Sequence, residues 1–171
     1  GICFRERKDT REINRRAFRT YQFLTQEFGY KDKDIIIFGR SVGSGPAFQL
    51  AEKTTPSLLL LMSAYTSIKN VANDLCWCAK WFLKERFNSL ATIKNIKCPF
   101  LLIHGQDDGV IRAGHSRVLY DEGQRHDKNC ELQIRAGMDH NNFSFKIDII
   151  EPIREFMAIN DISCKAKQNT S

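Results

Sequence analysis

The sequence lacks the features that would mark a membrane span, a secreted precursor or a zinc site. Its longest apolar run, Leu58 to Met62, is as long as a strand and far short of the roughly 20 residues that cross a bilayer. Residue 1 is glycine, and no basic start is followed by an apolar signal segment. The six cysteines form no paired C-x-x-C units. We therefore expect no metal site, and a reduced, cytoplasmic protein is the simplest interpretation.

Length and composition are those of one soluble domain. The 171 residues suit a single core, and 42% apolar with 27% charged residues is the usual globular balance. We expect one domain over 1–171, with a disordered tail at 163–171. The net charge of +6 is concentrated near the start. It indicates either the solvated face of a helix or contact with an anionic membrane surface. Basic and aromatic residues do not interleave, so no nucleic-acid partner is expected.

Helical and strand patterns alternate along the chain, which predicts an α/β fold with a mostly parallel sheet flanked by helices. Ile35 to Phe38 is a continuous β-branched and aromatic run, typical of a strand covered on both faces. Apolar periodicity and turn signals predict helices over 11–28, 46–53, 70–87, 114–120 and 147–159, and strands over 35–38, 58–62, 100–103 and 131–134.

The sequence between the first strand and the second helix is Gly39-Arg40-Ser41-Val42-Gly43, a G-x-S-x-G pattern. A strand, a tight turn and a helix are the context that a nucleophile elbow requires, with glycines where neighbouring side chains would collide. The following helix would direct its positive end at the Ser41 oxygen. A plain glycine-rich turn or a phosphate cradle is the alternative, although lysine is missing from the P-loop position.

A serine nucleophile needs a base and an acid that orients the base, and later strand ends supply both. His104-Gly105-Gln106-Asp107-Asp108 follows the third strand, and Asp139-His140 follows the fourth. Catalytic groups gather at the carboxyl edge of open α/β sheets, where these residues should lie. For the other histidines we expect a structural hydrogen bond at His104, a place at a helix start for His115 and exposure for His126. Asp139 is interpreted as a loop residue.

The strings GRSVGSGPA, SAYTSI, CPFLLIHGQDDGVI and AGMDHNNF resemble α/β-hydrolase motifs in family order over roughly 11–159. The chain looks like the C-terminal part of that fold and is most similar to the eukaryotic branch that includes palmitoyl-protein thioesterases. The resemblance implies that Ser41 is the nucleophile, Asp108 the acid and His140 the base. Asp107 is the fallback acid, and the Val42 N–H is one oxyanion donor. No metal or organic cofactor is implied.

The resulting expectation is a serine hydrolase of esters or thioesters, with a protein depalmitoylase as one form. An acylated protein or a lipid-like ester would be the substrate, and peripheral membrane contact is compatible with it. The alternatives are a serine peptidase or lysophospholipase of the same fold, and a non-catalytic binding module or inactive fragment. The apolar group of Trp77, Trp81 and Phe82 is interpreted either as helix packing or as a cap over an acyl chain.

One part of the family pattern is missing. Only about 34 residues precede the first strand, and no His-Gly, the usual source of a second oxyanion donor, occurs before Ser41. We therefore expect a chain that is incomplete at its N-terminus. Its first strand would then be an apolar, exposed edge.

Overall fold

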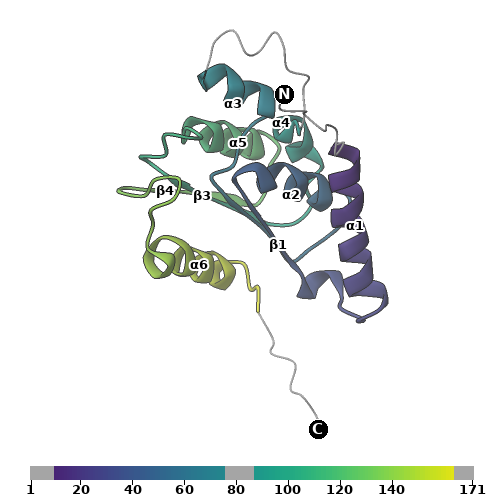
Figure 1. Cartoon of the computed structure of the whole chain (residues 1–171). Coiled ribbons are helices and arrows are strands. Elements are labelled where there is room, and N and C mark those ends of the chain that lie inside the picture. The colour runs from purple at the N-terminus through teal and green to yellow at the C-terminus, as the bar shows by residue number, and fades with distance from the viewer. Residues whose placement is uncertain (1–9, 76–86, 164–171) are drawn as a thin grey trace.

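The computed structural model describes residues 10–75 and 87–163 (Figure 1). The apolar group at Trp77, Trp81 and Phe82, the residues at 1–9 and the tail at 164–171 lie outside these ranges. Across the two described stretches, every helix falls short of the length and apolarity that a bilayer span requires.

Four parallel strands form the sheet in the order β1-β2-β3-β4. Their bounds are Ile36–Arg40, Leu58–Met62, Phe100–Gly105 and Cys130–Arg135. Strands β2 and β3 are buried along their whole length, as their uninterrupted apolar runs predict for strands covered on both faces. All three pairings are parallel, so the four carboxyl ends lie along one edge. The predicted fold class, a mostly parallel sheet flanked by helices, is confirmed.

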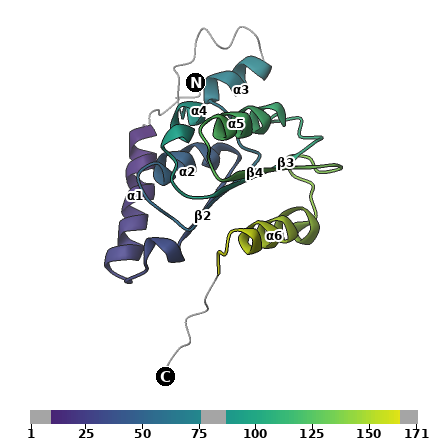
Figure 2. The ribbon, with the colours of Figure 1, turned by 180° about the vertical axis from the view of Figure 1, so that it is seen from behind.

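Helices cover both faces of the sheet, and each face has its own core (Figures 1 and 2). One layer contains α1 (Thr10–Gln26), α2 (Ser44–Ala51), α4 (Ser89–Thr92) and α5 (Gly114–Arg125). Its core joins Tyr21, Phe48, Leu59, Leu102 and Leu119. On the other face α6 (Glu151–Ile159) supplies Phe156 to a core with Leu58, Leu60, Leu101 and Ile103. Alternate residues of β2 and β3 thus enter opposite cores, as the two-residue period of a strand requires.

Several predicted helices differ in detail from those observed; the one expected over 114–120, for example, continues to Arg125 as α5. The one expected over 70–87 begins earlier, as α3 (Ile68–Leu75), and 76–86 lie outside the described residues. The closing helix starts as a π-helical turn, Phe145–Ile150, and α6 follows. Pro152 stands in the first turn of α6. Its missing N–H is tolerated there, because the first N–H groups of an α-helix have no partner within the helix. Short 3₁₀ turns occupy Asp32–Asp34, Ser41–Gly43 and Ile93–Asn95.

Strand β1 forms an edge of the sheet within the described part of the chain. Its Phe38 is 54% exposed, so the expectation that this strand is covered on both faces is wrong at that residue. The core beneath α6 is made by β2 and β3; Ile36 of β1 packs against it, and Phe38 is not part of it. The observed edge is apolar and exposed, as expected for a strand without an outer neighbour.

Candidate active site

Ser41 lies in a tight turn between β1 and α2. Its φ of +51° is in the left-handed region, which costs a non-glycine residue about 1–3 kcal/mol and persists only where the surroundings enforce it. Gly39 shows how close the packing is, because a Cβ there would lie 2.5 Å from the Ala47 Cβ. Gly43 has no described atom within 4 Å of such a position. Of the two glycines in the motif, only Gly39 is therefore required by this packing.

The residue after the serine is held by a buried tyrosine. Val42 is 66% exposed, while its carbonyl oxygen accepts a hydrogen bond from the Tyr65 hydroxyl at 3.3 Å. Burial raises the pKa of Tyr65 well above its usual value, so the hydroxyl keeps its proton and remains a donor. Tyr65 belongs to the SAYTSI segment, which the sequence associated with the family without giving its residues a role. The oxyanion function of the Val42 N–H stays a prediction.

Asp108 is a buried carboxylate with a full set of donors. Its Oδ1 accepts the backbone N–H groups of Val110 at 3.0 Å and Ile111 at 2.8 Å, and its Oδ2 lies 2.8 Å from His140 Nδ1. Burial by itself raises the pKa of Asp108, but the bonds from Ile111, His140 and Val110 outweigh that effect. The Ser63 hydroxyl acts in the same direction, although its geometry falls short of a hydrogen bond. The net result is a lowered pKa and an ionised carboxylate at neutral pH.

His140 lies in the loop after β4 and is oriented from two sides. Because Asp108 is ionised and can only accept, the proton between the two side chains belongs to His140 Nδ1, and in the neutral form of the imidazole the lone pair is then on Nε2. On the other side the Arg40 guanidinium donates to the His140 carbonyl oxygen, and to Asn141 Oδ1 at 3.3 Å. Arg40 immediately precedes Ser41, so this contact joins the serine turn to the histidine loop. Sequence reasoning missed Arg40, whose place between glycine and serine in the motif was the available signal.

Asp107, the fallback acid, points to a different partner. Its Oδ2 accepts the Gly137 N–H at 3.0 Å, and its own N–H donates to the Met138 carbonyl at 3.1 Å. Asp107 thus ties the acid loop to the histidine loop, whereas Asp108 contacts His140. The structure brings Asp108 and His140 together as a pair, and the catalytic roles of Ser41, Asp108 and His140 stay predictions.

The remaining histidines lie in the surroundings that the sequence predicts for each of them. His104 is buried, with hydrogen bonds at both ring nitrogens. His115, at the start of α5, is also buried and lies 2.9 Å from Thr66 Oγ1 and 3.1 Å from Asp74 Oδ2. His126 is exposed and pairs with Glu122.

Asp139 accepts three hydrogen bonds from Asn141 and Asn142, as a loop residue would. Within 10–75 and 87–163, no three His, Cys, Asp or Glu side chains gather closely enough to hold a metal ion.

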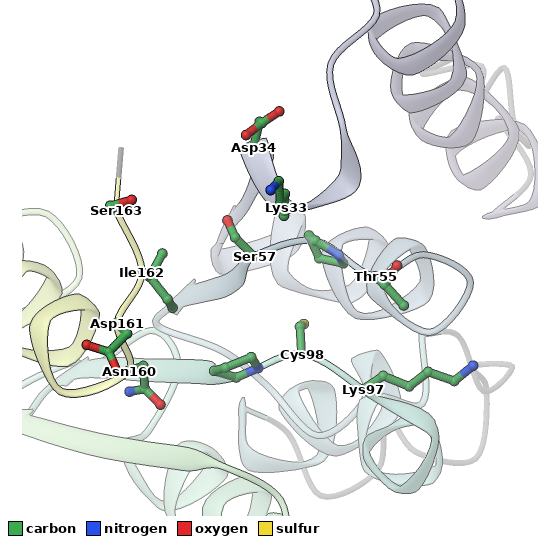
Figure 3. A pocket seen from close by; sticks show the side chains of 12 residues that line it. Lys33, Asp34, Thr55, Ser57, Lys97, Cys98, Asn160, Asp161, Ile162 and Ser163 are labelled. Atoms are coloured by element: carbon green, nitrogen blue, oxygen red, sulfur yellow. The ribbon is translucent and has the colours of Figure 1, made fainter. Parts of the chain in front are cut away.

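A cavity of about 550 Å³ lies away from these residues (Figure 3). Its walls come from segments that precede β1, β2 and β3, among them Asp34, Ser57 and Cys98, and from Asn160 and Ile162 after α6. The cavity is therefore at the amino ends of the strands. In open α/β sheets, ligands and catalytic groups collect at the carboxyl ends. The pair of Asp108 and His140, rather than this cavity, marks the candidate active site.

Comparison with known proteins agrees with this architecture. Residues 17–159 match the prolyl oligopeptidase family. An α/β-hydrolase from Acanthamoeba polyphaga mimivirus is 35% identical over 134 residues, which are 78% of this chain and 49% of that protein. The alpha/beta hydrolase domain-containing protein aho-3 of Caenorhabditis elegans is 31% identical over 140 residues, 80% of this chain and 40% of that protein. The chain thus spans about half, or less, of the length of these relatives.

A solved structure has the same fold. The acylaminoacyl peptidase of Pyrococcus horikoshii superposes with a TM-score of 0.63 and 17% identity, over 89% of this chain and 28% of the peptidase.

Proposed function

We propose that this chain, which belongs to the prolyl oligopeptidase family, is a serine hydrolase that cleaves esters or thioesters through an acyl-enzyme on Ser41. The family match, together with the α/β-hydrolase relatives, confirms the superfamily to which the sequence motifs pointed. The observation that carries the proposal is the hydrogen bond of 2.8 Å between Asp108 Oδ2 and His140 Nδ1. It is the acid–base half of a triad, at the edge of the sheet where Ser41 also lies.

Each group has a defined task in the proposed reaction. Ser41 Oγ attacks the acyl carbonyl, and His140 Nε2 takes its proton. The ionised Asp108 holds the imidazole in the required tautomer and stabilises the imidazolium that forms. His140 then returns the proton to the leaving thiolate or alkoxide, and water cleaves the acyl-enzyme by the same route. The Val42 N–H is assigned to the oxyanion, where a single donor contributes about 10²–10³ in rate.

For the substrate we propose an acylated protein or a lipid-like ester, with peripheral contact at a membrane surface. A palmitoyl thioester on a cysteine is one form of it. The support is the sequence resemblance to palmitoyl-protein thioesterases, together with a site that needs only an acyl carbonyl and a leaving group.

A serine peptidase is the second candidate, favoured by the family that the chain matches and by the peptidase with the same fold. The two can be separated by turnover of a palmitoylated cysteinyl peptide against turnover of an acylaminoacyl peptide at equal concentration. Faster cleavage of the peptide bond would replace the thioesterase assignment and leave the roles of Ser41 and His140 in place.

Labelling with a fluorophosphonate probe tests the core of the proposal. The wild-type chain should be labelled, whereas Ser41→Ala and a heat-denatured sample should not. A folded wild-type chain, shown by circular dichroism, that takes up no label would refute the proposal. It would instead favour a binding module without catalytic activity.

A further inference from the structure

A second histidine, His104, is built into the structure behind the candidate acid. It lies one residue before the end of β3, and none of its surface is exposed. Its Nδ1 lies 2.7 Å from the Ser116 hydroxyl on α5, and its Nε2 lies 2.8 Å from the Ile111 carbonyl oxygen in the acid loop. Burying an imidazole without partners would be costly, so both contacts are needed to keep it in the core.

These partners determine where the proton of His104 lies. The Ile111 carbonyl can only accept, so Nε2 carries the hydrogen and Nδ1 accepts from the Ser116 hydroxyl. Burial lowers the pKa of His104, against the opposing effects of the Ile111 carbonyl and the Asp108 charge. The ring is therefore neutral at physiological pH and fixed in one tautomer.

The same ring nitrogen also lies near the acid. His104 Nε2 lies 3.4 Å from Asp108 Oδ2, the same oxygen that accepts the hydrogen bond from His140 Nδ1. Ile111, whose carbonyl accepts from His104, also donates its own N–H to Asp108 Oδ1 at 2.8 Å. His104 is therefore close to Asp108 itself, and it also hydrogen-bonds to Ile111, whose N–H donates to Asp108.

We infer that His104 is a positioning residue, which fixes the acid loop between β3 and α5 so that Asp108 presents Oδ2 to His140. The inference rests on the proposed hydrolase function. His104 is not itself a catalytic residue, because its ring is fully buried and both nitrogens are already occupied.

A pair of amide variants separates positioning from packing. In His104→Gln the terminal amide N–H reaches the place of Nε2 and keeps the bond to Ile111. In His104→Asn the shorter amide overlies Nδ1 and keeps only the bond to Ser116. Each variant retains one of the two hydrogen bonds, so similar losses of thermal stability are expected. Positioning predicts that kcat for an ester falls about 10²-fold in His104→Asn with KM unchanged, and stays near the wild-type value in His104→Gln.

A second measurement detects the hydrogen bond between Asp108 and His140 directly and does not require turnover. The Nδ1 proton of His140, bonded to Asp108, gives a low-field NMR resonance that should persist in His104→Gln and be lost or shifted in His104→Asn. The inference would be overturned if kcat fell by the same factor in both variants, in proportion to their loss of thermal stability. A His104→Asn chain that keeps the wild-type resonance would also overturn it. If the wild-type chain shows neither labelling nor turnover, the proposed function fails and the resonance still decides the role of His104.

Discussion

Gly105 offers a direct test of whether the loops that hold Asp108 and His140 must pack as the structure shows. It is the last residue of β3, and a Cβ there would lie 2.2 Å from the Met138 carbonyl oxygen and 2.7 Å from its carbonyl carbon. Both atoms belong to the backbone that leads into His140, so no side-chain rotation relieves the contact. In Gly105→Ala the histidine loop must move by about 1 Å to restore ordinary van der Waals distance.

The expected magnitudes follow from that displacement. Misplacing a catalytic group by about 1 Å costs about 10²-fold in rate, and overpacking of this kind costs about 1–3 kcal/mol of stability. For a chain of this size the latter lowers Tm by roughly 2–12 °C. The rate of fluorophosphonate labelling measures the loss of reactivity, and thermal unfolding followed by circular dichroism measures the loss of stability.

Gly114→Ala is the matched control. A Cβ at this first residue of α5 meets no described atom within 4 Å, and alanine is favoured in helices. It should label and unfold like the wild-type chain. If Gly105→Ala also behaved as wild type in both assays, the close approach of β3 to the histidine loop would be refuted.

Three further outcomes are expected. Asp108→Asn should lower kcat for an ester about 10⁴-fold, because an amide facing His140 Nδ1 favours the wrong tautomer; a loss of less than tenfold would remove Asp108 from the triad. Burial lowers the pKa of both His104 and His115, so the unfolded chain binds more protons below about pH 6.5. The free energy of unfolding in urea should then fall as the pH drops from 7 to 5, and fall less in a His104→Gln/His115→Gln double variant; parallel curves would contradict this. Burial also raises the pKa of Cys98 to about 11, so iodoacetamide at pH 8 should alkylate it in urea and not in the folded chain, as peptide mapping can show.

The architecture could be predicted well from local patterns. Uninterrupted apolar runs located β2 and β3, and the glycine-rich motif located the turn at Ser41, because burial on both faces and a tight turn impose strong constraints on sequence. Phe38 shows where this reasoning fails. An apolar side chain indicates that a strand can be buried, but which helix covers it depends on the tertiary arrangement of α6.

The sequence was enough to name the residues of the candidate site, but not to say which of them contact each other. Order along the chain was enough to place Asp108 and His140 on neighbouring loops, and the structure joins them. The sequence could not distinguish Asp107 from Asp108 by spacing alone, since adjacent loop residues point in different directions. The motif located Arg40 beside Ser41, but the sequence could not reveal its contact with the His140 carbonyl, which lies 100 positions away along the chain.

The cavity of Figure 3 bears on how inhibitors of this protein should be sought. It opens at the amino ends of β1–β3, whereas Ser41 follows the carboxyl end of β1, about 16 Å away along a five-residue strand. A compound that filled the cavity would be detected in a binding screen and would still leave Ser41 accessible. Competition with an active-site probe, rather than binding alone, is therefore the criterion that separates inhibitors of the chemistry from ligands of the opposite edge.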